Sequence, residues 1–207
     1  ALLISVKSGF PNPDDKDQIL NTLGNAYTRL GDYKKASKYL LSAYYYNSNR
    51  NQFNLAAKQV NNLSRILYDL NLHDSAIILL RPVLRSPDIS KKRKIAALCE
   101  MSRHFTDMQF PDSAKLYLLK AKTEVNSSNA DDVQAANQKI GEAELLFYAK
   151  EAEPGSFISK FNRKIIGSRQ DIDRDQCKLV NILANAYSNS EKFDSAMYCY
   201  NYSLRNL

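Results

Sequence analysis

The sequence lacks several features that mark particular classes of protein. Its 207 residues contain no tryptophan and no run of eighteen apolar residues, so they hold no candidate transmembrane helix. The opening ALLISVKSGF has no basic stretch before its short apolar run, which is untypical of a signal peptide. Three cysteines without a CxxC pair are an odd number, and we expect buried free thiols instead of a disulfide framework.

Sequence motifs of catalysis and of cofactor binding are also missing. No glycine-rich phosphate loop, GxSxG or HExxH is present. His73 and His104 are far apart without a metal-ligand spacing, and no histidine or asparagine is spaced to activate Cys99. We therefore predict a protein that is not an enzyme, with no cofactor and no metal site, and a packing role for His73.

Basic residues outnumber acidic ones, 29 to 22, which gives a formal net charge of +7. Their densest run is KKRK at 91–94, preceded by Arg81 and Arg85. A solvated helix face is the simplest interpretation, and a patch for nucleic acid or anionic lipid is the alternative. Because no zinc-finger spacing, RNP-like strand or basic zipper accompanies the run, nucleic acid is an unfavoured partner.

A pattern of small and bulky residues recurs along the chain. LGNAYTRLGDYKKA at 23–36 returns as LSRILYDLNLHDSA at 63–76 and as MSRHFTDMQFPDSA at 101–114. A further clear copy, LANAYSNSEKFDSA, lies at 183–196. The interval from Ala114 to Ala196 is about twice the repeat spacing and leaves room for one degenerate copy, with helices expected at 130–153 and 156–167.

Each copy predicts two amphipathic helices. Leu20, Leu23, Tyr27 and Leu30 recur at three and four residues, which is one face of a helix. Gly31 is expected to end this helix, and the Asp32 carboxylate to cap the next one.

Two slots of the repeat hold small residues, because the paired helices must approach closely there and a large residue would push them apart. The first-helix slot holds Gly24, Ser64, Ser102 and Ala184, and the second-helix slot holds Ala36, Ala76, Ala114 and Ala196.

The pattern resembles the tetratricopeptide repeat family, W-x2-L-G-x2-Y with a later alanine. The matching residues are Leu23, Gly24, Tyr27, Gly31, Tyr33 and Ala36, with Leu20 in the tryptophan slot. The resemblance implies an all-α fold, a right-handed superhelical solenoid of about five antiparallel helical hairpins. The intervals between the first three copies exceed the repeat length of the family, which implies longer helices or turns and a less regular superhelix.

We predict one solenoid over residues 14–207, in which the fourth repeat is the degenerate one. The repeats are expected near 17–50, 57–90, 95–128, 130–168 and 177–207. Residues 1–13 are expected to be the end of a truncated preceding helix plus a turn. Since the last hairpin stops inside its second helix, we expect the parent protein to continue.

The resemblance implies binding of a protein or peptide segment on the concave face, which the first helices form. The polar residues that hairpin packing leaves unused there are Asn21, Asn25, Arg29, Lys58, Asn61, Asn62, Arg65, Arg103, Lys178, Asn181, Asn185 and Ser188. Amides suit an extended backbone and cations attract acidic groups, so an acidic segment is a candidate partner. The alternative is a polar wall that only keeps the solenoid soluble.

The family's capture of a C-terminal carboxylate by chaperone adaptors can be compared residue by residue. Asn25 and Asn62 match the asparagines of that clamp. Its three cationic slots hold Asn21, Ala96 and Glu100, which argues against a chaperone-tail clamp.

A DSA tripeptide opens three of the second helices, at 74–76, 112–114 and 194–196. In this the chain is similar to repeat regions of bacterial sensor kinases and of helix-turn-helix regulators. We therefore predict the interaction or sensor region of a larger bacterial regulatory protein, in the cytoplasm or the periplasm. The alternatives are a self-association scaffold that forms a homodimer and, less favoured, a nucleic-acid-binding helical array.

Overall fold

Every element of the described chain is an α-helix, as the sequence predicts. The computed structural model describes residues 13–125, 130–150, 180–181, 183–185, 187–188 and 191–204. Its helices are α2 (Pro13–Arg29), α3 (Tyr33–Ser48), α4 (Phe53–Asp69), α5 (His73–Arg85), α6 (Lys91–Asp107), α7 (Pro111–Val125), α8 (Ala130–Lys150) and α11 (Phe193–Leu204). Two predicted segments lie outside these residues. They are the helix end and turn expected at 1–13, of which only Pro13 is described, and the helix expected at 156–167.

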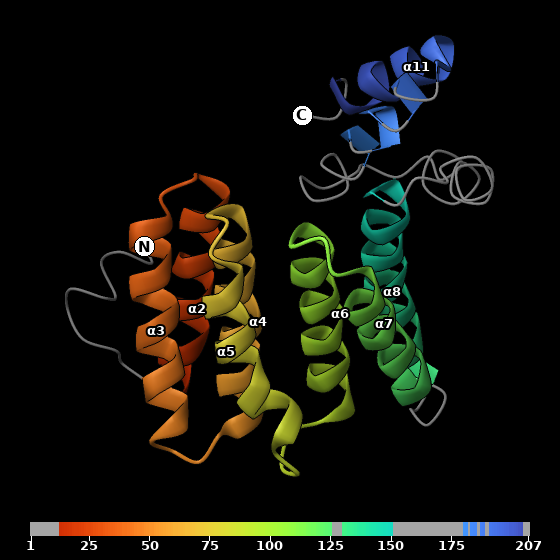
Figure 1. The fold of residues 1–207 in the computed structure, drawn as a ribbon. Helices are drawn as coiled ribbons and strands as arrows, with labels where there is room; N and C mark the ends of the chain where they lie inside the picture. The colour runs from red at the N-terminus through yellow and green to blue at the C-terminus, as the bar shows by residue number, and fades with distance from the viewer. Residues whose placement is uncertain are drawn as a thin grey trace.

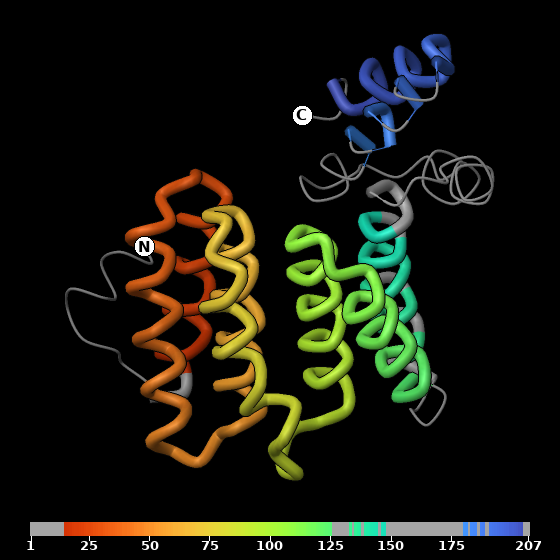
Figure 2. Tube along the Cα trace, in the orientation of Figure 1, coloured from red at the N-terminus to blue at the C-terminus, as the bar shows by residue number. Residues whose placement is uncertain are grey.

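Helices α2 to α8 pack in chain order as antiparallel neighbours (Figure 1). Each first helix also packs on the first helix of the next unit, so that α2, α4, α6 and α8 make a continuous layer. Among the described helices, the second helices α3, α5 and α7 make no such contact with one another. The first helices therefore lie closer together and form the inner wall of a solenoid, whose course Figure 2 traces.

The turn inside each hairpin uses one residue in the left-handed backbone region. Gly31 has φ +75°, and the residues in the same slot of the other copies, Asn71, Gln109 and Glu191, have φ of 57°, 62° and 58°. Only glycine adopts this conformation without a steric penalty. The same slot therefore has a positive φ in all four clear copies, which confirms the repeat register that the sequence predicts.

The same turns share a backbone hydrogen bond that closes each of them. The N–H of Asp32 donates to the carbonyl of Tyr27 at 3.0 Å, and the N–H of Leu72 donates to the carbonyl of Leu67 at 2.8 Å. Equivalent bonds follow at Phe110 and Lys192. This pattern satisfies carbonyls that the end of a helix leaves without partners. Asp32 also caps α3, since its carboxylate accepts from the N–H of Lys35 at 3.1 Å.

The small slots are contact points between helices, as predicted. A Cβ added to Gly24 would lie 2.6 Å from Cγ and Cδ2 of Leu40, whose side chain is fully buried. The small residues of the other copies are also buried: Ala36, Ala76, Ala114 and Ala196 on the second helices, and Ser64, Ser102 and Ala184 on the first. Backbones thus approach closely at the same point of every hairpin.

Apolar cores join each unit to the next. Ala36 and Leu40 of α3 form one cluster with Leu63 and Ile66 of α4. Further clusters link α4, α5 and α6, and then α6, α7 and α8. Helix α8 occupies the stretch expected for the first helix of the degenerate repeat. Within the last described segment, Val180, Leu183, Ala184 and Tyr187 pack with Ala196 and Cys199.

Candidate partner-binding face

Several of the residues predicted for the concave face belong to α2 and α4. Arg29 is exposed, and Asn25, Lys58, Asn62 and Arg65 are half-buried. Because α2 and α4 pack directly on one another, these polar residues belong to two neighbouring units. Amide and cationic groups of this kind can bind both the backbone and the charged side chains of an extended segment.

Two of the asparagines assigned to the concave face are buried in the joints between units. The side-chain oxygen of Asn21 accepts a hydrogen bond from Nδ2 of Asn62 at 3.1 Å, which ties α2 to α4. Nδ2 of Asn61 donates to the backbone carbonyl of Arg93 at 3.2 Å, which ties α4 to α6. Both side chains therefore have a structural contact that the sequence did not reveal.

Arg103 holds the third unit to α8. Its Nη2 lies 2.9 Å from Oε2 of Glu142, and its Nη1 lies 3.7 Å from Oε1 of Glu100. Burial opposes the charge of the guanidinium, but the two carboxylates outweigh it and raise the pKa of Arg103. The guanidinium is thus already engaged by two acidic groups of the wall.

The residues assigned to the last unit lie in the segment around α11. Asn181 and Ser188 are half-buried, and Asn185 is exposed and accepts a hydrogen bond from the hydroxyl of Tyr200. Lys178 lies outside the described residues.

A comparison with models of protein families agrees with this structure of helical pairs, turns and small slots. The tetratricopeptide repeat family matches residues 17–50, which comprise most of α2, all of α3 and the turn between them. In this stretch the chain is similar to a tetratricopeptide repeat. No curated protein matches the chain. Tetratricopeptide repeats mediate protein–protein interaction, so the repeat supports a protein-binding module in general terms.

The repeat units bring together two histidines that are 31 residues apart in sequence. Nδ1 of His73 lies 3.0 Å from Nδ1 of His104, and Nε2 of His104 lies 2.9 Å from Oγ of Ser64. The ring of Tyr68 meets both imidazoles edge to face. His104 has no exposed surface, and burial lowers its pKa to about 4. The contacts of His73 agree with the packing role predicted for it.

The sequence does contain a signal for these joints. Ser64 and His104 are 40 residues apart, which is the interval between the first two copies of the repeat. The Asn21–Asn62 and Arg103–Glu142 pairs are 41 and 39 apart. Polar residues separated by about one repeat on first helices are therefore candidates for contacts between units.

Metal clusters and reactive cysteines are two further kinds of site that the described residues could contain. No three histidine, cysteine, aspartate or glutamate side chains lie close enough there to hold a metal ion. Cys99 is a buried free thiol, and burial raises its pKa to about 12, far above that of a nucleophilic cysteine. None of the described helices is both long and apolar enough to cross a membrane.

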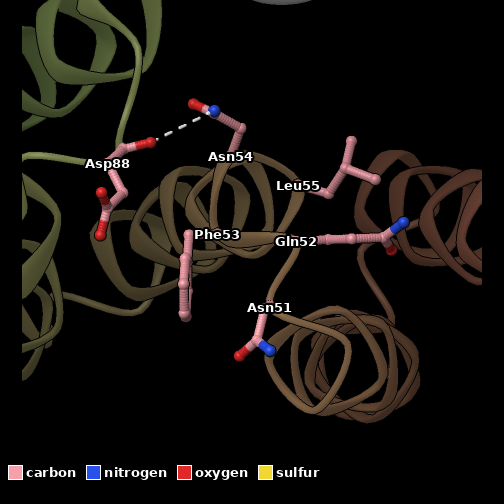
Figure 3. A pocket seen from close by; sticks show the side chains of 6 residues that line it. All are labelled: Asn51, Gln52, Phe53, Asn54, Leu55 and Asp88. Atoms are coloured by element: carbon pink, nitrogen blue, oxygen red, sulfur yellow. Dashed lines mark hydrogen bonds between the residues drawn. The ribbon is translucent and has the colours of Figure 1, made fainter.

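A shallow cavity of about 570 Å³ lies between the α3–α4 turn, the first residues of α4 and the α5–α6 loop (Figure 3). Its lining is Asn51, Gln52, Phe53, Asn54, Leu55 and Asp88. Asn54 ties the first turn of α4 to the α5–α6 loop, because its Oδ1 accepts from the N–H of Ser90 at 2.7 Å and its Nδ2 donates to the carbonyl of Asp88 at 3.4 Å. None of the residues predicted for partner binding lines this cavity.

Proposed function

We propose that the inner wall of the solenoid binds an extended protein or peptide segment, without catalysis. The observation that carries this proposal is the continuous layer of first helices, on which Asn25, Lys58, Asn62 and Arg65 retain partly accessible polar groups. A concave wall of this kind can contact several consecutive residues of a ligand.

We further propose that this module is the interaction or sensor region of a larger bacterial regulatory protein. The support is the DSA opening of α5, α7 and α11, which is similar to the repeat regions of such regulators. The full-length gene product tests this part directly. An adjoining kinase or helix-turn-helix domain is the expected finding, and a full-length enzyme of metabolism would contradict it.

Site-specific photo-crosslinking tests the binding face. A photoreactive amino acid replaces Asn25 or Lys58 on the inner wall, and Lys38 or Lys115, exposed on second helices, in the control variants. We expect the inner-wall variants to capture the same partner and the controls to capture none of it. Equal capture from both faces would place binding elsewhere and contradict the proposal.

Self-association is the second candidate, and exposed apolar side chains on the second helices favour it. Leu41 and Tyr45 of α3 and Leu116 and Leu119 of α7 are exposed although they are large and apolar. Light scattering at several protein concentrations distinguishes the two functions. A dimer that Leu41→Lys and Leu119→Lys abolish would support self-association, whereas a monomer at all concentrations would exclude it.

A further inference from the structure

The second helix of a unit contacts the following unit through one fixed slot of the repeat. Tyr33 and His73 occupy this slot in the first and second copies. The hydroxyl of Tyr33 donates to Oδ2 of Asp69 on α4 at 3.1 Å, and Nδ1 of His73 lies 3.0 Å from Nδ1 of His104 on α6. The slot is therefore part of the joint between one unit and the next.

Two further slots, four and eleven residues later, belong to the same joints. Ile77 is buried in the core cluster that α5 shares with α4 and α6. Tyr44 is partly buried against that cluster, and Leu84 is partly buried against the core of α6, α7 and α8. Because positions i, i+4 and i+11 lie on one stripe of an α-helix, the three slots form a single contact stripe.

In the last described unit this stripe consists of Phe193, Met197 and Leu204, and all three side chains are exposed. Their exposed fractions are 62%, 59% and 69%, although α11 buries Ala196 and Cys199 on its other side. The stripe thus has the position and the apolar character of a joint between units, yet it is open to solvent. An apolar patch of this kind marks an interaction site.

The charge of α11 indicates what can cover the stripe. Helices α3 and α7 carry three lysines each, whereas Phe193–Leu204 contains neither lysine nor arginine. No other described helix lacks both residue types. The one charged residue of α11 is Asp194, in the first turn. A nearly uncharged face can pack on an identical face without repulsion, and a two-fold axis brings identical faces together.

The first described helix offers a poorer match than α11 itself. On α4, the side chains that meet the preceding unit include Ile66 and Asp69. The same slots of α2 hold Ala26 and Arg29, which are exposed. A small and a charged side chain cover little of Phe193, so packing of α2 from a second copy on α11 is not favoured.

We propose that the stripe of Phe193, Met197 and Leu204 is a dimer contact, on which α11 of a second copy of this chain packs antiparallel. This geometry places Phe193 of one copy beside Leu204 of the second, with both Met197 side chains near the two-fold axis. Specific interfaces usually bury about 800 Å² per partner, and one short helix supplies less, so we expect a reversible dimer. The inference is independent of peptide binding on the inner wall, and it places self-association on α11 instead of α3 and α7.

Sedimentation velocity of the full chain over a wide range of concentration tests the contact. We expect the wild type to change reversibly from monomer to dimer. Met197→Lys and Met197→Glu each bring like charges together at the axis, and each should raise the dissociation constant of the dimer by about tenfold or more. An equimolar mixture of the two variants should dimerise again, because opposite charges then meet across the axis.

Two lysine substitutions are the matched controls. Tyr198→Lys changes the next residue of the same helix, in the slot where α3 has the exposed Lys38, and should leave the dissociation constant unchanged. Leu41→Lys makes the same change at an exposed residue of α3 and should also have no effect. Thermal unfolding of dilute Met197→Lys should match that of dilute wild type, because the side chain is exposed in the monomer.

Several results would overturn the dimer contact while peptide binding on the inner wall stands. These are a wild type that is monomeric at every concentration, a dimer that Met197→Lys retains, and a mixture of the two Met197 variants that stays monomeric. A dimer that Leu41→Lys abolishes and Met197→Lys retains would place the contact on α3. A lower melting temperature of dilute Met197→Lys would show that Met197 is covered within one chain, which also contradicts the proposal.

Discussion

The side chain of Leu40 occupies the space that a methyl group on Gly24 would need. A Cβ at this position would lie 2.6 Å from two carbons of Leu40, and Leu40 itself is fully buried between α2, α3 and α4. Since a buried leucine cannot turn outward, the contact fixes how closely the two helices of the first hairpin pack.

Gly24→Ala is expected to destabilise the protein by about 1 to 3 kcal/mol, because overpacking outweighs the better helix propensity of alanine. Urea unfolding followed by circular dichroism measures the change in the free energy of unfolding. In the Leu40→Ala background, which opens the site, the same substitution should be neutral or stabilising. Equal costs in both backgrounds would contradict the contact.

Gln109→Gly is expected to stabilise the protein by about 1 kcal/mol, because Gln109 has φ 62° in the hairpin turn and glycine relieves that strain. Gly31→Ala, at φ +75° with no heavy atom within 4 Å of the added carbon, should cost a similar amount. Gln109→Ala is the matched control and should not stabilise. If it stabilises as much as Gln109→Gly, the backbone explanation is wrong.

Acid is expected to weaken the fold through His104. Its folded pKa of about 4 is below the ordinary value of 6.5, so the unfolded chain binds the proton more readily. The stabilisation is complete above pH 6.5 and is lost as the pH falls towards 4. Between pH 7.5 and pH 5 the free energy of unfolding should fall by about 2 kcal/mol from this group alone.

The groups around His104 define the control for this measurement. His73 faces it from α5, Ser64 and Tyr68 from α4, and Glu100 and Asp107 lie on α6 itself. Urea unfolding at both pH values should show a smaller pH dependence for His104→Gln than for the wild type. An unchanged pH dependence would mean that other groups cause the effect.

The Cys99 thiol should resist alkylation in the folded protein. It is 2% exposed and its pKa is raised to about 12, so almost no thiolate forms near neutral pH. Iodoacetamide treatment followed by peptide mass spectrometry measures its labelling with and without urea. Rapid labelling of Cys99 in the native protein would contradict its burial against α7 and α8.

The sequence predicted the fold well because the repeat is fixed by local constraints. A left-handed residue at Gly31 and small residues at Gly24 and Ala36 must recur wherever a hairpin recurs, and such slots are readable along one chain. The sequence does not show how these slots are placed relative to the next unit. Asn61 has the spacing of a surface residue on α4, but α6 packs against it and its amide bonds to the carbonyl of Arg93.

For the same reason, the sequence could not show which predicted site residues are engaged by neighbouring units. The sequence predicts a binding role for Arg103 because the packing pattern within the hairpin does not use it, although Glu100 lies three residues away on the same helix. Its stronger contact, Glu142, lies in the degenerate repeat, where the pattern gives no register. Pairings between units depend on superhelical geometry, and a periodic sequence pattern does not contain that information.

The joint between the second and third units combines a histidine that must stay neutral with acceptor oxygens that have no donor. In a repeat array, stability is approximately a sum over units and the interfaces between neighbours. Protonation of His104 therefore weakens one interface selectively. As the pH falls, α2–α5 and α6–α8 are expected to separate as two cooperative blocks before either block unfolds.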